Sequence, residues 1–147
     1  MATGRHPAAR PMTSFADTNV VAHALDRADP AKQRLATALL RRRPRPRTSP
    51  QVLRETYVVA RTKLGMPAED AAAAVHALLP TVAVVEDAAL VMRATSAAQR
   101  WQISLWDALI VEAARQAGAD TLLSEDLQHG MDFDGVVVRN PFADLAT

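Results

Sequence analysis

The chain contains no cysteine, which excludes a disulfide-stapled fold and every thiolate metal site, and fits the reducing cytoplasm. Glycine is scarce, at 5 of 147 residues, and no glycine-rich phosphate loop is present. Aromatic residues make up only 4% of the chain, so alanine, valine and leucine have to supply the core. No apolar run approaches the roughly 18 residues that a membrane-spanning helix needs. We therefore expect a cytoplasmic protein without a membrane partner.

Charge is unevenly distributed although the net charge is only +1. Residues 1–63 hold 13 of the 17 Lys and Arg residues, whereas residues 120–147 hold 6 of the 16 acids and a single Arg. The stretch "RRRPRPR" at 41–47 concentrates the positive charge. Guanidinium groups suit phosphate, but arginines are also common at an exposed helix end. Both interpretations stay open for Arg41, Arg42, Arg43, Arg45 and Arg47.

Short apolar runs alternate with helical patterns along the chain. Strands are expected at 13–16, 81–86, 121–124 and 135–139. Helices are expected from about Thr18, after Asp29, after Ser49, and over 67–80, 87–100 and 104–118, with Asp29 and Ser49 as N-caps before proline. This alternation predicts one α/β domain with a mainly parallel, short-stranded sheet flanked by helices. We place it at residues 13–147, after a loose tail of residues 1–12.

Two acids lie at strand ends. Asp17 directly follows the first expected strand, and Asp126 follows the strand at 121–124. In an open α/β sheet, ligands bind at the carboxyl ends of the strands. The alternatives are ordinary ones: Asp17 caps a helix and Asp126 belongs to a turn, with Glu125 competing for any functional role.

Two further acids lie on helices. Glu55 sits at the rim of an apolar helix face, and its alternative is a surface glutamate. Asp107 stands three residues after Ser104, so it also fits a capping box. If Asp17, Glu55, Asp107 and Asp126 converge, their charges repel one another, and a hard cation such as Mg²⁺ or Mn²⁺ resolves the repulsion. Such a site suits phosphodiester hydrolysis.

The segments "FADTNVVAHALD", "SPQVLRETYVVARTK", "SLWDALIVEAARQAG" and "LLSEDLQHG" occur in this order, followed by "GVVVRNPF". Together they resemble the PIN domain and, more narrowly, the VapC-type toxins of toxin–antitoxin pairs. The resemblance implies a single PIN domain that cleaves single-stranded or loop RNA with Mg²⁺ or Mn²⁺.

By position, the resemblance makes Asp17, Glu55, Asp107 and Asp126 catalytic, with Asp17, Asp107 and Asp126 as metal ligands. Asn19 and Ser124 match polar positions beside the site. It also implies an antitoxin partner, a small DNA-binding protein, and we expect a homodimer. Apolar positions on the first two helices are candidates for the antitoxin dock: Val20, Val21, Ala24, Leu25, Leu35, Leu39 and Leu40.

Other functions fit the residues less well. An aspartyl phosphatase built on Asp17 usually needs an acid two residues later, and position 19 is Asn. A receiver-type module needs a late lysine, and none follows Lys63. A catalytically inert PIN-like module that binds RNA or protein is the main alternative. For Trp106 we expect core packing; for Trp101, core packing and base stacking stay open.

Overall fold

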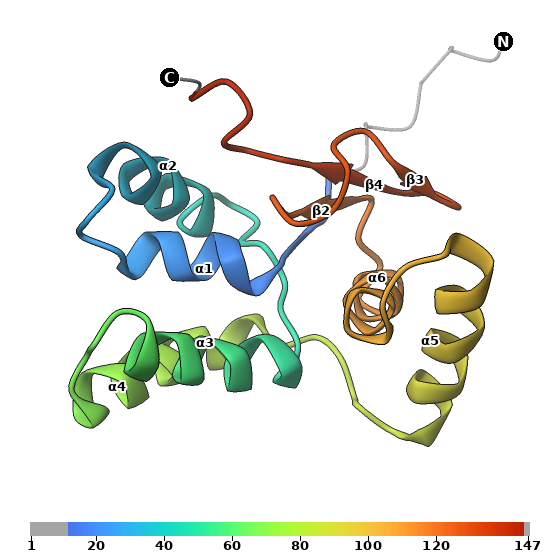
Figure 1. Ribbon diagram of the computed structural model, residues 1–147, viewed down its shortest axis with the longest axis horizontal. Coiled ribbons are helices and arrows are strands. Elements are labelled where there is room, and N and C mark those ends of the chain that lie inside the picture. The colour runs from blue at the N-terminus through green and yellow to red at the C-terminus, as the bar shows by residue number, and fades with distance from the viewer. Residues whose placement is uncertain (1–11, 146–147) are drawn as a thin grey trace, which may run out of the picture.

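The computed structural model describes residues 12–145, so the predicted N-terminal tail lies outside the described part except for the exposed Met12. Six α-helices and four strands follow one another in this part of the chain. Figure 1 shows how they are arranged in space. Their order is β1 (Ser14–Ala16), α1 (Thr18–Leu25), α2 (Pro30–Leu40), α3 (Pro50–Thr62), α4 (Ala68–Leu78), α5 (Ala88–Trp101), α6 (Leu105–Gln116), β2 (Thr121–Leu123), β3 (Asp132–Phe133) and β4 (Val136–Arg139). A short 3₁₀ helix, η1 (Leu79–Thr81), extends α4. The predicted α/β architecture is confirmed.

All six predicted helices are present, and local side chains explain where several of them begin. Asp29 accepts a hydrogen bond from the Lys32 amide (3.2 Å), and Ser49 accepts one from the Val52 amide (3.4 Å). In both helices a proline occupies the first turn, where the missing amide hydrogen is no loss. The two N-caps predicted from the sequence are therefore confirmed.

The sheet has the order β1-β2-β4-β3. The first three strands are parallel, with Ser14 opposite Thr121 and Thr121 opposite Val137. The edge strand β3, which the sequence did not predict, pairs antiparallel with β4. Asp134 and Gly135 join them with φ of 53° and 98°, the positive values that a tight hairpin turn requires.

The strand predicted at 81–86 is wrong. Thr81 ends η1, and the chain then makes one isolated bridge, between Val82 and Thr48. The Thr48 amide donates to the Thr81 carbonyl (2.9 Å), and the Ala83 amide donates to the Thr48 carbonyl (3.1 Å). No further partner continues this pairing within residues 12–145, and Val85 is 70% exposed. An apolar run without a neighbouring strand cannot complete a ladder.

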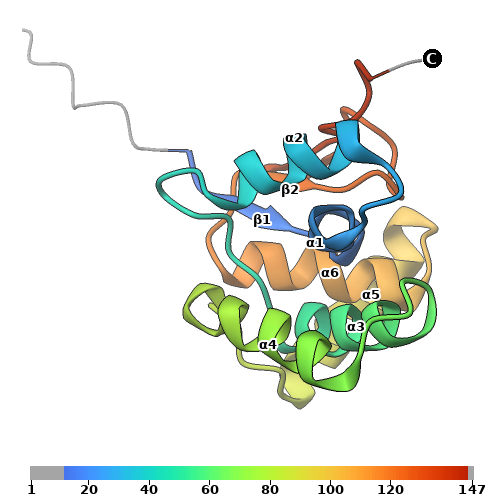
Figure 2. The same ribbon diagram turned by 90° about the vertical axis from the view of Figure 1, so that its left-hand side faces the viewer.

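The core lies between the sheet and the helices. Phe15, Leu122 and Val138 come from three adjacent strands and are fully buried. Helix α6 packs against β2 and β4, and α5 covers α6 on its far side (Figure 1). In Figure 2, β1 runs directly into the first turn of α1. The parallel strands therefore bring the ends of β1 and β2 to one edge, next to the start of α1.

None of the helices in residues 12–145 is long and apolar enough to cross a membrane.

Candidate active site

Asp17 lies between β1 and α1 and is the N-cap of α1, so both elements fix its position. Its Oδ1 accepts a hydrogen bond from the Thr18 amide (2.7 Å), and its own amide donates to the Leu123 carbonyl of β2 (3.0 Å). The residue is only 5% exposed. Burial raises the pKa of Asp17 to about 6; hydrogen bonds from Ser124 and Thr18 oppose the rise, and the charges of Asp126 and Glu55 add to it. Asp17 thus caps the helix and also carries a carboxylate that lacks a balancing cation.

Ser124 and Asn19 tie Asp17 to the end of β2. The Ser124 hydroxyl donates to Asp17 Oδ2 (2.9 Å), and Asn19 Nδ2 donates to the same oxygen (3.4 Å). Asn19 Oδ1 accepts from the Glu125 amide (3.2 Å), and Ser124 Oγ accepts from the Asp126 amide (3.2 Å). The two polar residues singled out in the sequence therefore link Asp17 directly to the loop that carries Asp126.

The other three acids are less buried than Asp17. Glu55 and Asp126 are exposed, and Asp107 is half-buried. Partial burial raises the pKa of Asp107, the Ser104 hydroxyl lowers it, and the charge of Asp126 raises it further. The charges of Asp126 and Glu55 thus act on Asp17, and the charge of Asp126 also acts on Asp107. The four acids share one electrostatic neighbourhood.

The donor set fits a hard divalent cation. Carboxylate and hydroxyl oxygens are the ligands that Mg²⁺ and Mn²⁺ prefer. The carboxylates also repel one another, and a bound cation would offset this repulsion. Among residues 12–145, however, no three His, Cys, Asp or Glu side chains stand close enough together to hold a metal ion. Ligation by Asp17, Asp107 and Asp126 therefore needs a change in side-chain orientation, which exposed acids such as Asp126 make easily.

The Glu125 carboxylate contacts different side chains from those around Asp17. His23 Nε2 donates to its Oε1 (2.5 Å), and Lys32 Nζ donates to its Oε2 (3.1 Å). Partial burial raises the pKa of Glu125, but the hydrogen bonds and charges of His23 and Lys32 outweigh burial and lower it overall. In the sequence, Glu125 was an alternative to Asp126 for a functional role. In the structure, the Glu125 carboxylate is hydrogen-bonded to side chains of α1 and α2. No local pattern in the sequence predicts that Glu125 pairs with Lys32, which is distant in the chain.

The arginine cluster lies toward the other end of β1. The Arg47 amide donates to the Ser14 carbonyl, and the Arg47 carbonyl accepts from the Ala16 amide, so this segment runs parallel to β1. Arg47 Nη1 donates to the Ala117 carbonyl, and Arg45 Nε donates to the Leu40 carbonyl (3.3 Å). Two of the five predicted RNA-contacting arginines are therefore used within the fold. Arg41, Arg42 and Arg43 are exposed, on the amino side of the strand that ends at Asp17.

The two tryptophans have different environments. Trp101 packs edge-on against Phe133, with ring centroids 5.3 Å apart, which is a core contact. Trp106 is 67% exposed, so the prediction that it packs in the core is wrong. It lies in the first turn of α6, where its backbone carbonyl accepts from Gln51 Nε2 (3.4 Å). An exposed aromatic ring thus directly precedes Asp107.

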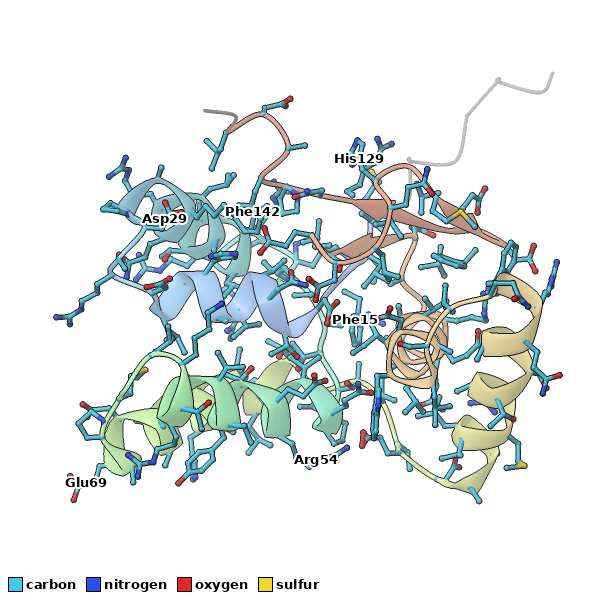
Figure 3. The ribbon with its side chains drawn as sticks, in the orientation of Figure 1. Phe15, Asp29, Arg54, Glu69, His129 and Phe142 are labelled. Carbon is cyan, nitrogen blue, oxygen red and sulfur yellow. The ribbon has the colours of Figure 1, made fainter. Side chains whose placement is uncertain are left out.

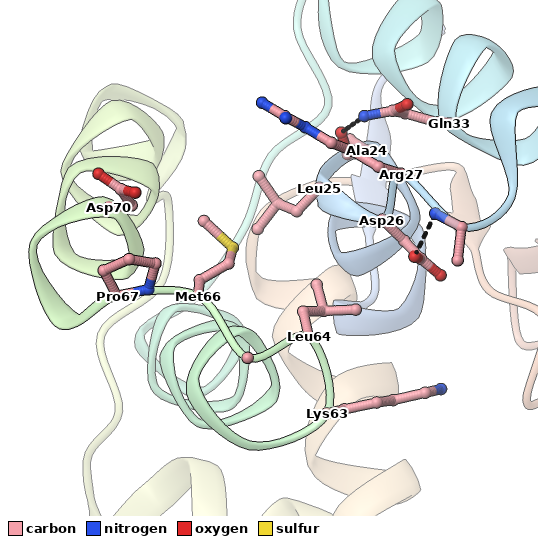
Figure 4. Close-up of a pocket in the computed structure, with 12 residues that line it drawn as sticks. Ala24, Leu25, Asp26, Arg27, Gln33, Lys63, Leu64, Met66, Pro67 and Asp70 are labelled. Atoms are coloured by element: carbon pink, nitrogen blue, oxygen red, sulfur yellow. Dashed lines mark hydrogen bonds between the residues drawn. The ribbon is translucent and has the colours of Figure 1, made fainter.

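A large surface pocket lies away from the acids. It has a volume of about 670 Å³ and is formed by the α1–α2 turn and the α3–α4 turn. Figure 4 shows Leu25 and Asp26 on one side and Leu64, Met66 and Pro67 on the other. The described residues that line it do not include the four acids, so this pocket and the acids are separate features of the surface.

The structure thus combines a mostly parallel sheet with a buried aspartate at the carboxyl end of β1 and three further acids that are electrostatically coupled to it or to one another. The sequence matches the PIN domain family over residues 14–130, well over half of the chain, and the protein belongs to that family. PIN domains are typically nucleases and usually use divalent metals. No curated protein matches the chain.

Proposed function

We propose that the protein is a divalent-metal-dependent endoribonuclease that acts on single-stranded or loop RNA as the toxin of a toxin–antitoxin pair. One observation carries the nuclease proposal. Asp17 is buried at the tip of β1, and burial together with the charges of Asp126 and Glu55 raises its pKa to about 6. A structural aspartate in such a place is usually paired with Lys or Arg, whereas within residues 12–145 the hydrogen-bond donors to Asp17 are uncharged.

The proposed roles follow from the position of each acid. A bound Mg²⁺ or Mn²⁺ supplies an activated water and neutralises charge on the scissile phosphate. Asp17, held by Thr18 and Ser124, is the rigid ligand. Asp107 and Asp126 are the adjustable ligands, and the exposed Glu55 on α3 orients water or substrate. Asn19 and Ser124 keep Asp17 in place.

Cleavage of a 5′-labelled single-stranded RNA in the presence of Mn²⁺ tests this proposal. Asp126→Asn should lower the initial rate by at least about 100-fold, the upper end of what loss of a supporting residue costs at metal sites. The matched control is Asp134→Asn, an exposed acid on the β3–β4 turn that pairs with Arg100 (2.6 Å). Its rate should equal that of the wild type.

Three results contradict the nuclease: no cleavage by the wild type, cleavage that a chelator leaves unchanged, or equal rates for Asp126→Asn and Asp134→Asn. RNA binding without cleavage would instead support the inert binding module.

The antitoxin proposal is supported by a groove between α1, α2 and α4. Of the apolar positions proposed for the dock, Val20, Val21 and Leu39 are buried in the core, and Leu35 packs against it. Ala24, Leu25 and Leu40, together with the edge of the buried Val21, line this groove of about 630 Å³. Arg41, Arg43 and Arg45 also line it. An amphipathic partner helix with acidic flanks fits an apolar groove edged by arginine. A homodimer stays a prediction, which sedimentation analysis checks.

A further inference from the structure

The Glu125 carboxylate is held by two side-chain donors, and a buried aromatic ring packs against both of them. His23 of α1 and Lys32 of α2 each donate a hydrogen bond to one of its carboxylate oxygens, at 2.5 and 3.1 Å. Phe142, which is 5% exposed, packs against both donors: its ring lies edge-on to His23, with centroids 4.7 Å apart, and 5.4 Å from Lys32 Nζ. Figure 3 shows Phe142 beside these two helices. We name His23, Lys32, Glu125 and Phe142 the Glu125 clamp.

Asn140 also connects the clamp to the loop that carries Glu125 and Asp126. The Asn140 amide donates to His129 Nδ1 (2.9 Å), and Asn140 Oδ1 accepts from the Phe142 amide (2.9 Å). The segment Asn140–Phe142 therefore touches the loop that carries Asp126 and reaches α1 and α2 through Phe142. It follows β4 and lies outside the residues that match the PIN family, which end at 130.

Asp126 itself has little to hold it. It is exposed, and its amide donates to Ser124 Oγ (3.2 Å). Its neighbour Glu125 is anchored through both the backbone, to Asn19 Oδ1, and the clamped side chain. Fixing the residue before Asp126 restricts the backbone torsions that set the position of the Asp126 carboxylate relative to Asp17. Side-chain anchoring of this kind is how supporting residues orient ligands at metal sites.

We propose that the Glu125 clamp positions Asp126, so that Glu125 acts as a positioning residue and the segment Asn140–Phe142 is a functional part of the site. This inference rests on the proposed function where it concerns the metal. The clamp also keeps the Glu125 carboxylate paired with Lys32, which prevents a fifth unbalanced negative charge beside the other acids.

The first measurement is hydrogen exchange in the metal-free protein, which needs neither cleavage nor metal. Glu125→Ala should speed exchange of the Glu125 and Asp126 amides by at least about tenfold, because local opening then costs less free energy. Lys32→Met, which keeps the apolar stem, should give a smaller increase at the same amides. The matched control is Glu86→Ala, which removes a surface ion pair with Arg54 (2.7 Å) and should leave both amides unchanged.

The second measurement is Mn²⁺ affinity by calorimetry. Loss of a supporting residue lowers metal affinity by about 10- to 100-fold, so we expect at least about a tenfold loss in Glu125→Ala. Glu125→Gln keeps a carbonyl oxygen that accepts from His23 or Lys32 but is a poor metal ligand. Its affinity should therefore lie much closer to that of the wild type than to that of Glu125→Ala.

The outcomes separate the two proposals. Unchanged exchange at both amides in Glu125→Ala overturns the clamp. Unchanged exchange with equal losses of affinity in Glu125→Gln and Glu125→Ala identifies Glu125 as a ligand and also overturns it. If the wild type binds no Mn²⁺, the proposed nuclease fails, while the exchange measurement still decides whether the clamp fixes the Asp126 loop.

Discussion

Replacement of Asp17 by Asn should stabilise the metal-free protein at neutral pH. The pKa of Asp17 is raised from 3.8 to about 6, so the folded state holds this proton more tightly than the unfolded state does. The contribution of protonated Asp17 to the free energy of unfolding is fully present below about pH 4 and is lost as the pH rises through about 6. At about 1.4 kcal/mol per pKa unit, the ionised carboxylate costs the folded state about 3 kcal/mol at pH 8.

Asn cannot ionise, and it has the same shape. In Asp17 one carboxyl oxygen accepts from the Thr18 amide, and the other accepts from Ser124 and Asn19. The Asn side chain has a single acceptor oxygen, so the variant loses about 1 kcal/mol of hydrogen bonding at every pH. Asp17→Asn should thus be about 2 kcal/mol more stable than the wild type at pH 8 and about 1 kcal/mol less stable at pH 4.

Urea unfolding at intervals from pH 4 to pH 8 measures this difference. Asp134→Asn, an exposed substitution, should stay within about 0.5 kcal/mol of the wild type throughout. Mn²⁺ should reverse the order at pH 8, because a ligand at 100 times its dissociation constant stabilises the wild type by about 2.7 kcal/mol. A stability difference between Asp17→Asn and the wild type that is constant from pH 4 to pH 8 would refute the reasoning.

Two further predictions concern RNA and the antitoxin. Replacing Arg41, Arg42 and Arg43 with Ala should flatten the salt dependence of RNA binding by roughly 0.7 unit of log–log slope for each phosphate that these arginines neutralise in the wild type. An unchanged slope together with weaker antitoxin binding would assign these arginines to the α1–α2–α4 groove instead. Expression of the wild type alone should arrest growth, and co-expression of the antitoxin should restore it. Asp107→Asn should abolish the arrest and still bind the antitoxin, since Asp107 is not among the residues that line the groove; undiminished arrest contradicts the nuclease-toxin mechanism.

Local sequence was sufficient for the helices. Their beginnings depend on contacts that span only a few residues, such as Asp29 with Lys32 and Ser49 with Val52, and these could be predicted without knowledge of the fold. The sequence also placed Asp17 at the tip of a strand, because an apolar run ends there and a helical pattern begins. Asn19 and Ser124 were named as residues beside the site from the resemblance to the PIN domain.

Strand pairing was less predictable. The run at 81–86 has the composition of a strand, but among the described residues its single bridge partner is Thr48. The two-residue strand β3 forms because β4 lies beside it. Whether an extended segment becomes a strand depends on a neighbour distant in the sequence. Trp106 shows the same limit, because its apolar helix does not reveal which face is covered.

The electrostatics of the site were decided by tertiary structure alone. The raised pKa of Asp17 results first from burial, which no short stretch of sequence specifies. Glu125 and Asp126 are adjacent and equally acidic in the sequence, yet one is paired with His23 and Lys32 and the other is exposed beside Asp17. Sequence places both carboxylates at the end of a strand; only packing against α1, α2 and Phe142 separates them, because charge pairing depends on distance in space.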